Sequence, residues 1–96
     1  MKYLICCTTI QHCREYFDYL KKIAPLDIPC TFNYRGLKAT IGENFYTITT
    51  KIPRGNRFDI ALYEEDETFN PLELYYCVEY PPQPLDKNFF ENIKKI

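Results

Sequence analysis

Four apolar residues, Ile60 to Tyr63, form a short run that is closed on both sides. Pro53 and Gly55 precede the run, and four consecutive acids, Glu64 to Glu67, follow it. A run of this length between turn residues and charges is typical of a buried strand. The chain must therefore place a strand in its core and bring carboxylates to the point where that strand ends.

The size and composition indicate one folded domain, residues 1–96. Hydrophobic residues make up 46% of the chain and charged residues 26%, which is ordinary for a globular protein, whereas 17% aromatic residues is high. Ninety-six residues suffice for a single core. No apolar run approaches the roughly 20 residues of a membrane span, and Met1 to Thr8 is too short for a signal peptide. We therefore expect a cytoplasmic protein that does not enter membranes.

A central strand and a helix are predicted at the start of the chain. The segment Tyr3 to Cys7 is continuously apolar, which suits a strand buried on both faces of a sheet. Thr8 follows as an N-cap, and Gln11, three residues later, completes a capping box. A helix is therefore predicted from Thr9 to Ala24, where Pro25 ends it.

The middle of the chain indicates more strands. Segments 37–41 and 45–50 flank a loop of turn-forming residues, Gly42-Glu43-Asn44, and predict a β-hairpin. Segment 30–34 alternates in character and indicates a strand at the edge of the sheet.

Segment 72–80 carries signals for both a helix and a strand. Asn70 and Pro71 are residue types that cap and begin a helix. Apolar residues alternate with others from Leu72 to Tyr80, however, and the β-propensity of 75–78 favours a strand. We predict a strand over 72–80.

An extended proline spacer, Pro81 to Pro84, leads to a last helix from Lys87 to Lys95 that Asp86 caps. Its inward stripe consists of Phe89, Phe90, Ile93 and Ile96. Together the elements predict an α/β (α+β) fold, a small single-domain sandwich in which two helices cover a mixed sheet of about five strands.

The charges are unevenly distributed along the chain. Residues 35–57 contain five bases and one acid, a balance of +4, and residues 59–79 contain seven acids and no base, a balance of −7. Such a layout is typical of solvated faces, and it also suits a charged patch that binds a partner.

The five cysteines are an odd number and include no C-x-x-C pair, so we expect reduced, mostly buried thiols. Whether Cys13, Cys30 and Cys77 assemble a metal site with His12 is left open by the sequence. His12 and Cys13 are neighbours on the predicted helix, where consecutive side chains diverge by about 100°, which is poor geometry for a nucleophile and its base. We expect His12 at the surface.

One pair of segments resembles a known family. Ile60-Ala61-Leu62-Tyr63-Glu64-Glu65 resembles the Walker B pattern of RecA-like ATPases of helicases and packaging motors, and Leu4-Ile5-Cys6-Cys7-Thr8-Thr9 resembles their strand-then-threonine segment. The resemblance implies a nucleotide and Mg²⁺ site beside Glu64. The chain contains no G-x-x-x-x-G-K-[ST], so the phosphate loop of that family is absent.

Two surfaces are candidates for binding. The basic segment 35–57 could bind nucleic acid through its Lys and Arg residues, with Tyr34 and Tyr46 stacking on bases. The acidic stretch could imitate phosphates and dock on a basic groove of a larger protein. The residues predicted for that partner surface are Tyr63, Glu64, Glu65, Asp66, Glu67, Phe69, Glu73, Tyr75 and Glu79, with Tyr80 as a further aromatic anchor.

We predict a non-enzymatic interaction module without cofactor that binds a larger protein, one that acts on nucleic acid. A small inhibitor carried by a phage or a mobile element has this make-up. The alternatives are a nucleotide- or metal-binding RecA-like remnant and a nucleic-acid binder that uses segment 35–57.

Overall fold

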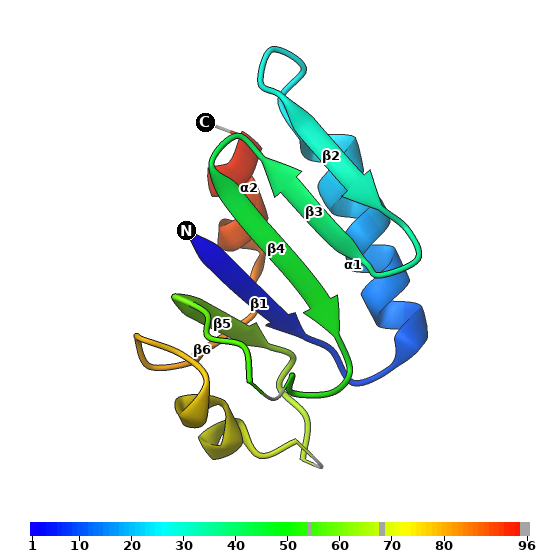
Figure 1. The fold of residues 1–96 in the computed structure, drawn as a ribbon. Coiled ribbons are helices and arrows are strands. Elements are labelled where there is room, and N and C mark those ends of the chain that lie inside the picture. The colour runs from blue at the N-terminus through cyan, green and yellow to red at the C-terminus, as the bar shows by residue number, and fades with distance from the viewer. Residues whose placement is uncertain (54, 68, 95–96) are drawn as a thin grey trace.

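The computed structural model describes residues 1–53, 55–67 and 69–94 and contains one six-stranded sheet with helices on its faces (Figure 1). The elements in chain order are β1 (Lys2–Cys6), α1 (Ile10–Ile23), β2 (Cys30–Asn33), β3 (Lys38–Ile41), β4 (Asn44–Thr49), β5 (Ile60–Tyr63), the 3₁₀ helix η1 (Pro71–Tyr76), β6 (Gln83–Pro84) and α2 (Lys87–Lys94). The predicted α/β class is confirmed, with slightly more strands than expected. No helix among the described residues is long and apolar enough to cross a membrane.

Strand β1 lies in the interior of the sheet, whose order is β2-β3-β4-β1-β5-β6. It pairs in parallel with β4 on one side and β5 on the other, while β2, β3 and β4 pair antiparallel. Strand β6 pairs in parallel with β5 and lies within the segment predicted as a proline spacer. The central position predicted for the apolar run at the N-terminus is therefore correct. Strand β2 is an edge strand, as predicted.

Helix α1 packs its apolar stripe on one face of the sheet, and its buried residues are Cys13, Phe17 and Leu20. The N-cap is Thr9 and not Thr8 as predicted: the Thr9 side chain accepts a hydrogen bond from the His12 N–H at 3.1 Å. Thr8 is instead bound to Glu64 through both its N–H and its hydroxyl. The Thr8 hydroxyl is therefore bound to Glu64, which follows β5, and Thr9 caps the helix.

The β3–β4 hairpin is present, with a loop of two residues rather than three. Asn44, predicted in the loop, pairs with Ile41 and begins β4. Gly42 has a φ of 61°, a conformation that glycine adopts without a steric penalty. A glycine at the first position of a two-residue loop closes the hairpin tightly.

The strand predicted over 72–80 is wrong. This segment forms most of the 3₁₀ helix η1 and the bend that follows it. The Asn70 side chain caps the helix by accepting from the Leu72 N–H at 3.1 Å, and Pro71 begins it. Among the described residues, this segment forms one β-bridge, in which Val78 pairs in parallel with Phe58. The local helix-start signal outweighed the period-two alternation.

The sheet separates two clusters of buried side chains. The larger cluster lies between the sheet and helices α1 and α2, and includes Ile5, Phe17, Tyr46 and Phe90. The smaller cluster lies on the other face, where η1 and its flanking residues cover β1 and β5. Its members are Leu4, Cys6, Phe58, Ala61, Leu74, Cys77 and Val78.

Helix α2 begins as predicted, because the Asp86 side chain accepts from the Phe89 N–H at 3.2 Å. Phe90 is buried against Tyr16 and Tyr19 of α1. The helix end predicted at Lys95, and the inward positions predicted for Ile93 and Ile96, lie outside the residues and side chains that the structure describes.

Candidate functional site

The predicted partner-binding residues fall into two groups in the structure. Glu64 turns inward to the start of α1. The remaining residues lie on β5, the loop after it, η1 and the bend that follows η1. Glu64 is bound by other groups of the protein, whereas most of the remaining residues are exposed to solvent.

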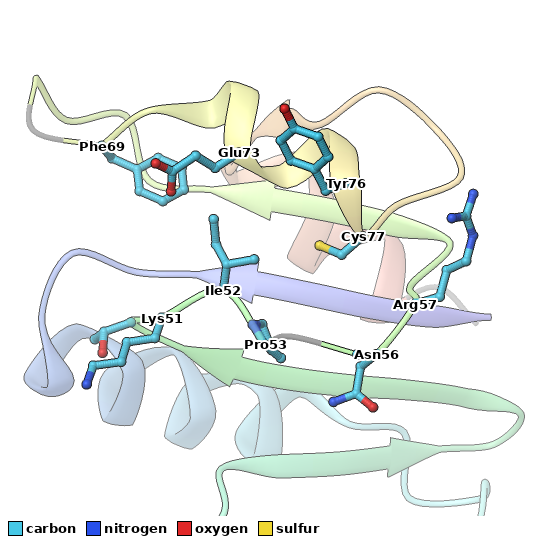
Figure 2. Close-up of a pocket in the computed structure, with 11 residues that line it drawn as sticks. Lys51, Ile52, Pro53, Asn56, Arg57, Phe69, Glu73, Tyr76 and Cys77 are labelled. Carbon is cyan, nitrogen blue, oxygen red and sulfur yellow. The ribbon is translucent and has the colours of Figure 1, made fainter.

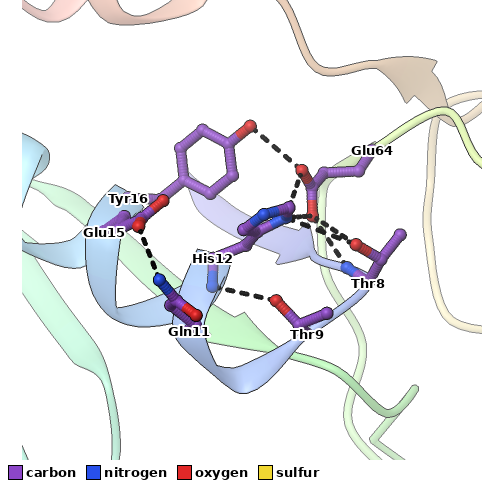
Figure 3. Close-up of polar contacts among 7 residues, drawn as sticks. All are labelled: Thr8, Thr9, Gln11, His12, Glu15, Tyr16 and Glu64. Carbon is purple, nitrogen blue, oxygen red and sulfur yellow. Dashed lines mark hydrogen bonds and ion pairs between the residues drawn. The ribbon is translucent and has the colours of Figure 1, made fainter.

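Glu64 is the centre of a polar cluster where β5 ends beside the N-terminus of α1 (Figure 3). Its Oε1 accepts hydrogen bonds from the Thr8 N–H at 2.7 Å and the Thr8 hydroxyl at 3.2 Å. His12 Nδ1 lies 3.0 Å from Oε2, and the Tyr16 hydroxyl donates to the same oxygen at 3.3 Å. The Glu64 side chain is only 16% exposed. Both carboxylate oxygens are thus bound by groups of the protein.

The surroundings of Glu64 favour its ionised form. Burial acts to raise the pKa of Glu64, but the hydrogen bond from the Thr8 backbone and the bond and charge of His12 outweigh it, so that its pKa lies below the ordinary value of 4.5. Burial, followed by the charge of Glu64 and the hydrogen bond to it, raises the pKa of Tyr16 to about 12. Tyr16 therefore remains a neutral donor at physiological pH.

His12 is held by this carboxylate through one ring nitrogen. An ionised Glu64 accepts, so Nδ1 carries the proton, and Nε2 has no hydrogen-bond partner among the described residues. The His12 side chain is 45% exposed. The Thr8 hydroxyl lies 3.4 Å from the same Nδ1, which the Glu64 carboxylate already binds, and no nucleophilic side chain is hydrogen-bonded to Nε2 within the described part of the chain.

The polar cluster joins two segments that are far apart in the sequence, Leu4 to Thr9 and Ile60 to Glu65. Strands β1 and β5 are parallel neighbours, and Glu64, at the end of β5, binds Thr8, at the end of β1. The surface position predicted for His12 agrees with its exposure, whereas its pairing with Glu64 was not predicted. The pair is 52 residues apart in sequence, so only the strand order could have revealed it.

The second group forms an outward acidic and aromatic surface, which we call the η1 surface. The exposed residues predicted for it are Glu65, Asp66, Glu67, Glu73, Tyr75 and Glu79, and Tyr80 is exposed as well. Tyr63 and Phe69 are half-buried beneath it, with ring centroids 5.7 Å apart, and pack against the smaller core cluster. These two rings support the surface more than they contribute contact area.

Two exposed residues of the η1 surface were not predicted. Leu72 is 65% exposed and Tyr76 is 88% exposed. A strand over 72–80 would have turned both to the same side as Leu74, which is fully buried. The 3₁₀ turn separates them, and the Asn70-Pro71 start signal was the sequence feature that could have revealed this.

A groove of about 830 Å³ lies between η1 and the segment that connects β4 to β5 (Figure 2). Phe69, Glu73 and Tyr76 line the η1 side, and Lys51 and Asn56 lie on the opposite side. At the end of the groove Arg57 makes a 3.0 Å ion pair with Glu79. Arg54, one of the predicted bases, lies outside the described residues.

The cysteines and His12 do not gather into one site. Cys13 belongs to the core cluster beneath the helices, whereas Cys77 belongs to the cluster on the other face of the sheet. The Cys30 thiol donates to the Ile28 carbonyl at 3.2 Å. Among the described residues no three His, Cys, Asp or Glu side chains are placed to hold a metal ion.

The structure also rearranges the predicted nucleic-acid residues. Tyr46 is buried beneath the helices and stacks on Tyr3, with ring centroids 4.9 Å apart, so it cannot stack on a base. Tyr34 is 53% exposed, its ring packs against Phe17, and its hydroxyl accepts a hydrogen bond from the Lys21 ammonium group. The exposed ring on β4 is the neighbouring residue, Phe45.

The chain was compared with family models, curated proteins and solved structures, and none of the three comparisons found a match.

Proposed function

We propose that the protein is a non-enzymatic interaction module and that the η1 surface binds a larger protein. A single observation carries this proposal: four large side chains of segment 72–80 point to solvent. They are Leu72, Tyr75, Tyr76 and Tyr80. Tyrosine is enriched at protein interfaces because its ring supplies contact area and its hydroxyl forms hydrogen bonds.

The segment is anchored in a way that supports a binding role. Leu74, Cys77 and Val78 are buried in the smaller core cluster, and the Phe58 N–H donates to the Cys77 carbonyl at 2.7 Å. The outward rings are therefore carried on a segment that is already ordered. Such preorganisation reduces the entropy lost on binding.

The charge of the η1 surface indicates the kind of partner. Glu65, Glu67 and Glu73 are exposed beside the aromatic residues, and residues 59–79 contain no base. An acidic surface with aromatic anchors complements a basic groove, such as the one with which a nucleic-acid-processing protein holds phosphates. A small inhibitor of such a protein, carried by a phage or a mobile element, is the form of this function that we favour.

The proposal is tested by capture of proteins from an extract of the cells that encode this chain, followed by affinity measurement with each purified candidate. We expect Tyr75→Ala with Tyr76→Ala, and separately Glu65→Lys with Glu73→Lys, to weaken binding at least about tenfold. Asp18→Lys on the exposed side of α1 is the matched charge control and should leave the affinity unchanged. Binding that survives both double substitutions would remove the η1 surface from consideration.

A further inference from the structure

A second surface lies on the open part of the sheet. Helices α1 and α2 cover one face (Figure 1), and η1 with its flanking residues packs on the other face against β1 and β5. Within the part of the chain that the structure describes, the buried cluster beneath η1 contains no side chain of β2, β3 or β4, so their outward side chains on that second face lie outside it. Judged by the alternation with buried neighbours, they are Thr31, Asn33, Lys38, Thr40, Phe45, Thr47 and Thr49.

Phe45 is the unusual member of this face. Its ring is 51% exposed, although a phenylalanine has no polar group to make exposure favourable. In the sheet register Phe45 pairs with Thr40 on β3 and with Lys2 on β1. In the antiparallel pair, Thr40 and Phe45 lie about 4.5–5.5 Å apart at Cβ, and Lys2 is the neighbour of Phe45 on the parallel strand β1.

The same residues line a groove of about 330 Å³. Lys2 and Lys38 supply positive charge, Thr40 and Thr47 supply hydroxyl groups, and Asn56 supplies an amide. None of the described residues that line the groove is acidic. One acid lies beside it: the carboxylate of Asp59 accepts from the Lys2 backbone N–H at 2.7 Å.

We propose that this open sheet face binds single-stranded nucleic acid, with a base stacked on Phe45 and phosphates held by Lys2 and Lys38. An aromatic ring between cations on a polar sheet surface is the combination that recognises unpaired bases on a charged backbone. A duplex hides the faces of its bases, so the exposed ring specifies a single strand. The proposal uses residues that the η1 surface does not contain, and it stands independently of the proposed protein partner.

The experiment measures fluorescence anisotropy of a labelled 12-nucleotide single strand of mixed sequence, as DNA and as RNA, and of the matching DNA duplex, with the full chain at low salt. We expect the single strand to bind more tightly than the duplex. Phe45→Leu should weaken single-strand binding at least about fivefold, because leucine keeps an apolar surface but cannot stack. Phe45→Tyr keeps an aromatic ring that can stack and should retain the affinity.

The lysines are tested by charge reversal. Lys2→Glu with Lys38→Glu should abolish binding, whereas Lys22→Glu on α1, at an exposed site on the opposite side of the sheet, should change it less than twofold. Lys2→Gln with Lys38→Gln should reduce the slope of log affinity against log salt by about 1.4, since each phosphate contact on a single strand contributes about 0.7. Absence of binding at low salt, equal binding of duplex, or equal loss in Phe45→Leu and Phe45→Tyr would each overturn the proposal.

Discussion

Glu64 differs from the three acids that follow it because four protein groups bind its carboxylate: the Thr8 N–H, the Thr8 hydroxyl, His12 and Tyr16. Glu65 and its neighbours Asp66 and Glu67 are exposed. Glu64 thus joins β5 to the start of α1, across 52 residues of sequence. Its role in the fold is to hold these two elements together, whereas Glu65 and Glu67 are exposed to solvent.

Replacement of this residue should be costly to the fold. We expect Glu64→Gln to lower the free energy of unfolding by about 1–3 kcal/mol at pH 7, because the neutral amide weakens the bonds to its donors and turns an N–H₂ group toward one of them. Glu65→Gln, one residue away and exposed, is the control and should have little effect. Urea unfolding measures both.

The same comparison has a defined pH dependence. The pKa of Glu64 in the folded state lies below 4.5, so as pH falls the unfolded state takes up a proton before the folded state does. The ionised carboxylate therefore stabilises the fold fully above pH 4.5, and this contribution is lost as pH falls through the folded-state pKa. The difference between the wild-type chain and Glu64→Gln should therefore shrink in acid. A constant difference down to about pH 2 would contradict the assignment.

At the scale of elements, η1 divides one short segment into an anchored side and a displayed side. Leu74 is fully buried in the smaller core cluster, whereas Leu72, two residues earlier, is largely exposed. The same residue type on the same helix therefore has two roles, one in stability and one in the proposed binding surface.

This division is testable with a matched pair of substitutions. Leu74→Ala should destabilise the protein by about 2–5 kcal/mol, because it leaves a cavity beneath η1. Leu72→Ala should change stability by less than about 0.5 kcal/mol. Thermal and urea unfolding of the two variants give the measurement, and equal losses would show that η1 does not pack as described.

The elements also show what local sequence can predict. The sequence predicted helix α1, strand β5 and the β3–β4 hairpin. In each of them the spacing of apolar residues and the turn residues match the burial and the turns that the structure shows. Segment 72–80 was not predicted correctly, because its apolar residues fit a period of two while its cap fits a helix, and the helix-start signal of Asn70 and Pro71 outweighed the alternation. The cap at Thr9 and the Glu64 cluster depend on which strands are neighbours, and nothing local encodes strand order.

At the scale of the whole molecule, the burial of the cysteine thiols shows how well the core excludes solvent. Four of the five cysteines are buried, and only Cys30 is partly exposed. Burial, with smaller contributions from Cys77 and Cys13, raises the pKa of Cys6 to about 12, and burial likewise raises the pKa values of Cys7, Cys13 and Cys77. Reaction with a thiol reagent requires a thiolate that the reagent can reach.

We therefore expect one thiol to react in the folded protein and the other four to react only when the molecule opens. Labelling with a chromogenic disulfide reagent, with and without urea, counts them, and mass spectrometry of the peptides should identify Cys30 as the first site. Cys30→Ser should remove the early phase. Early modification of Cys6 or Cys7 would contradict the closed core.

The position of β1 between two parallel partners has a consequence for synthesis. Strand β1 precedes β4 and β5 in the chain. Its backbone can therefore form its parallel hydrogen bonds only after both of those strands have been synthesised. At about 5–20 residues per second the ribosome needs roughly 2–9 s to pass from Cys6 to Thr49. Throughout that interval the apolar residues Tyr3 to Cys6 of β1 have no partner strand. Transiently exposed apolar surface of this kind is the reason that nascent chains need chaperones.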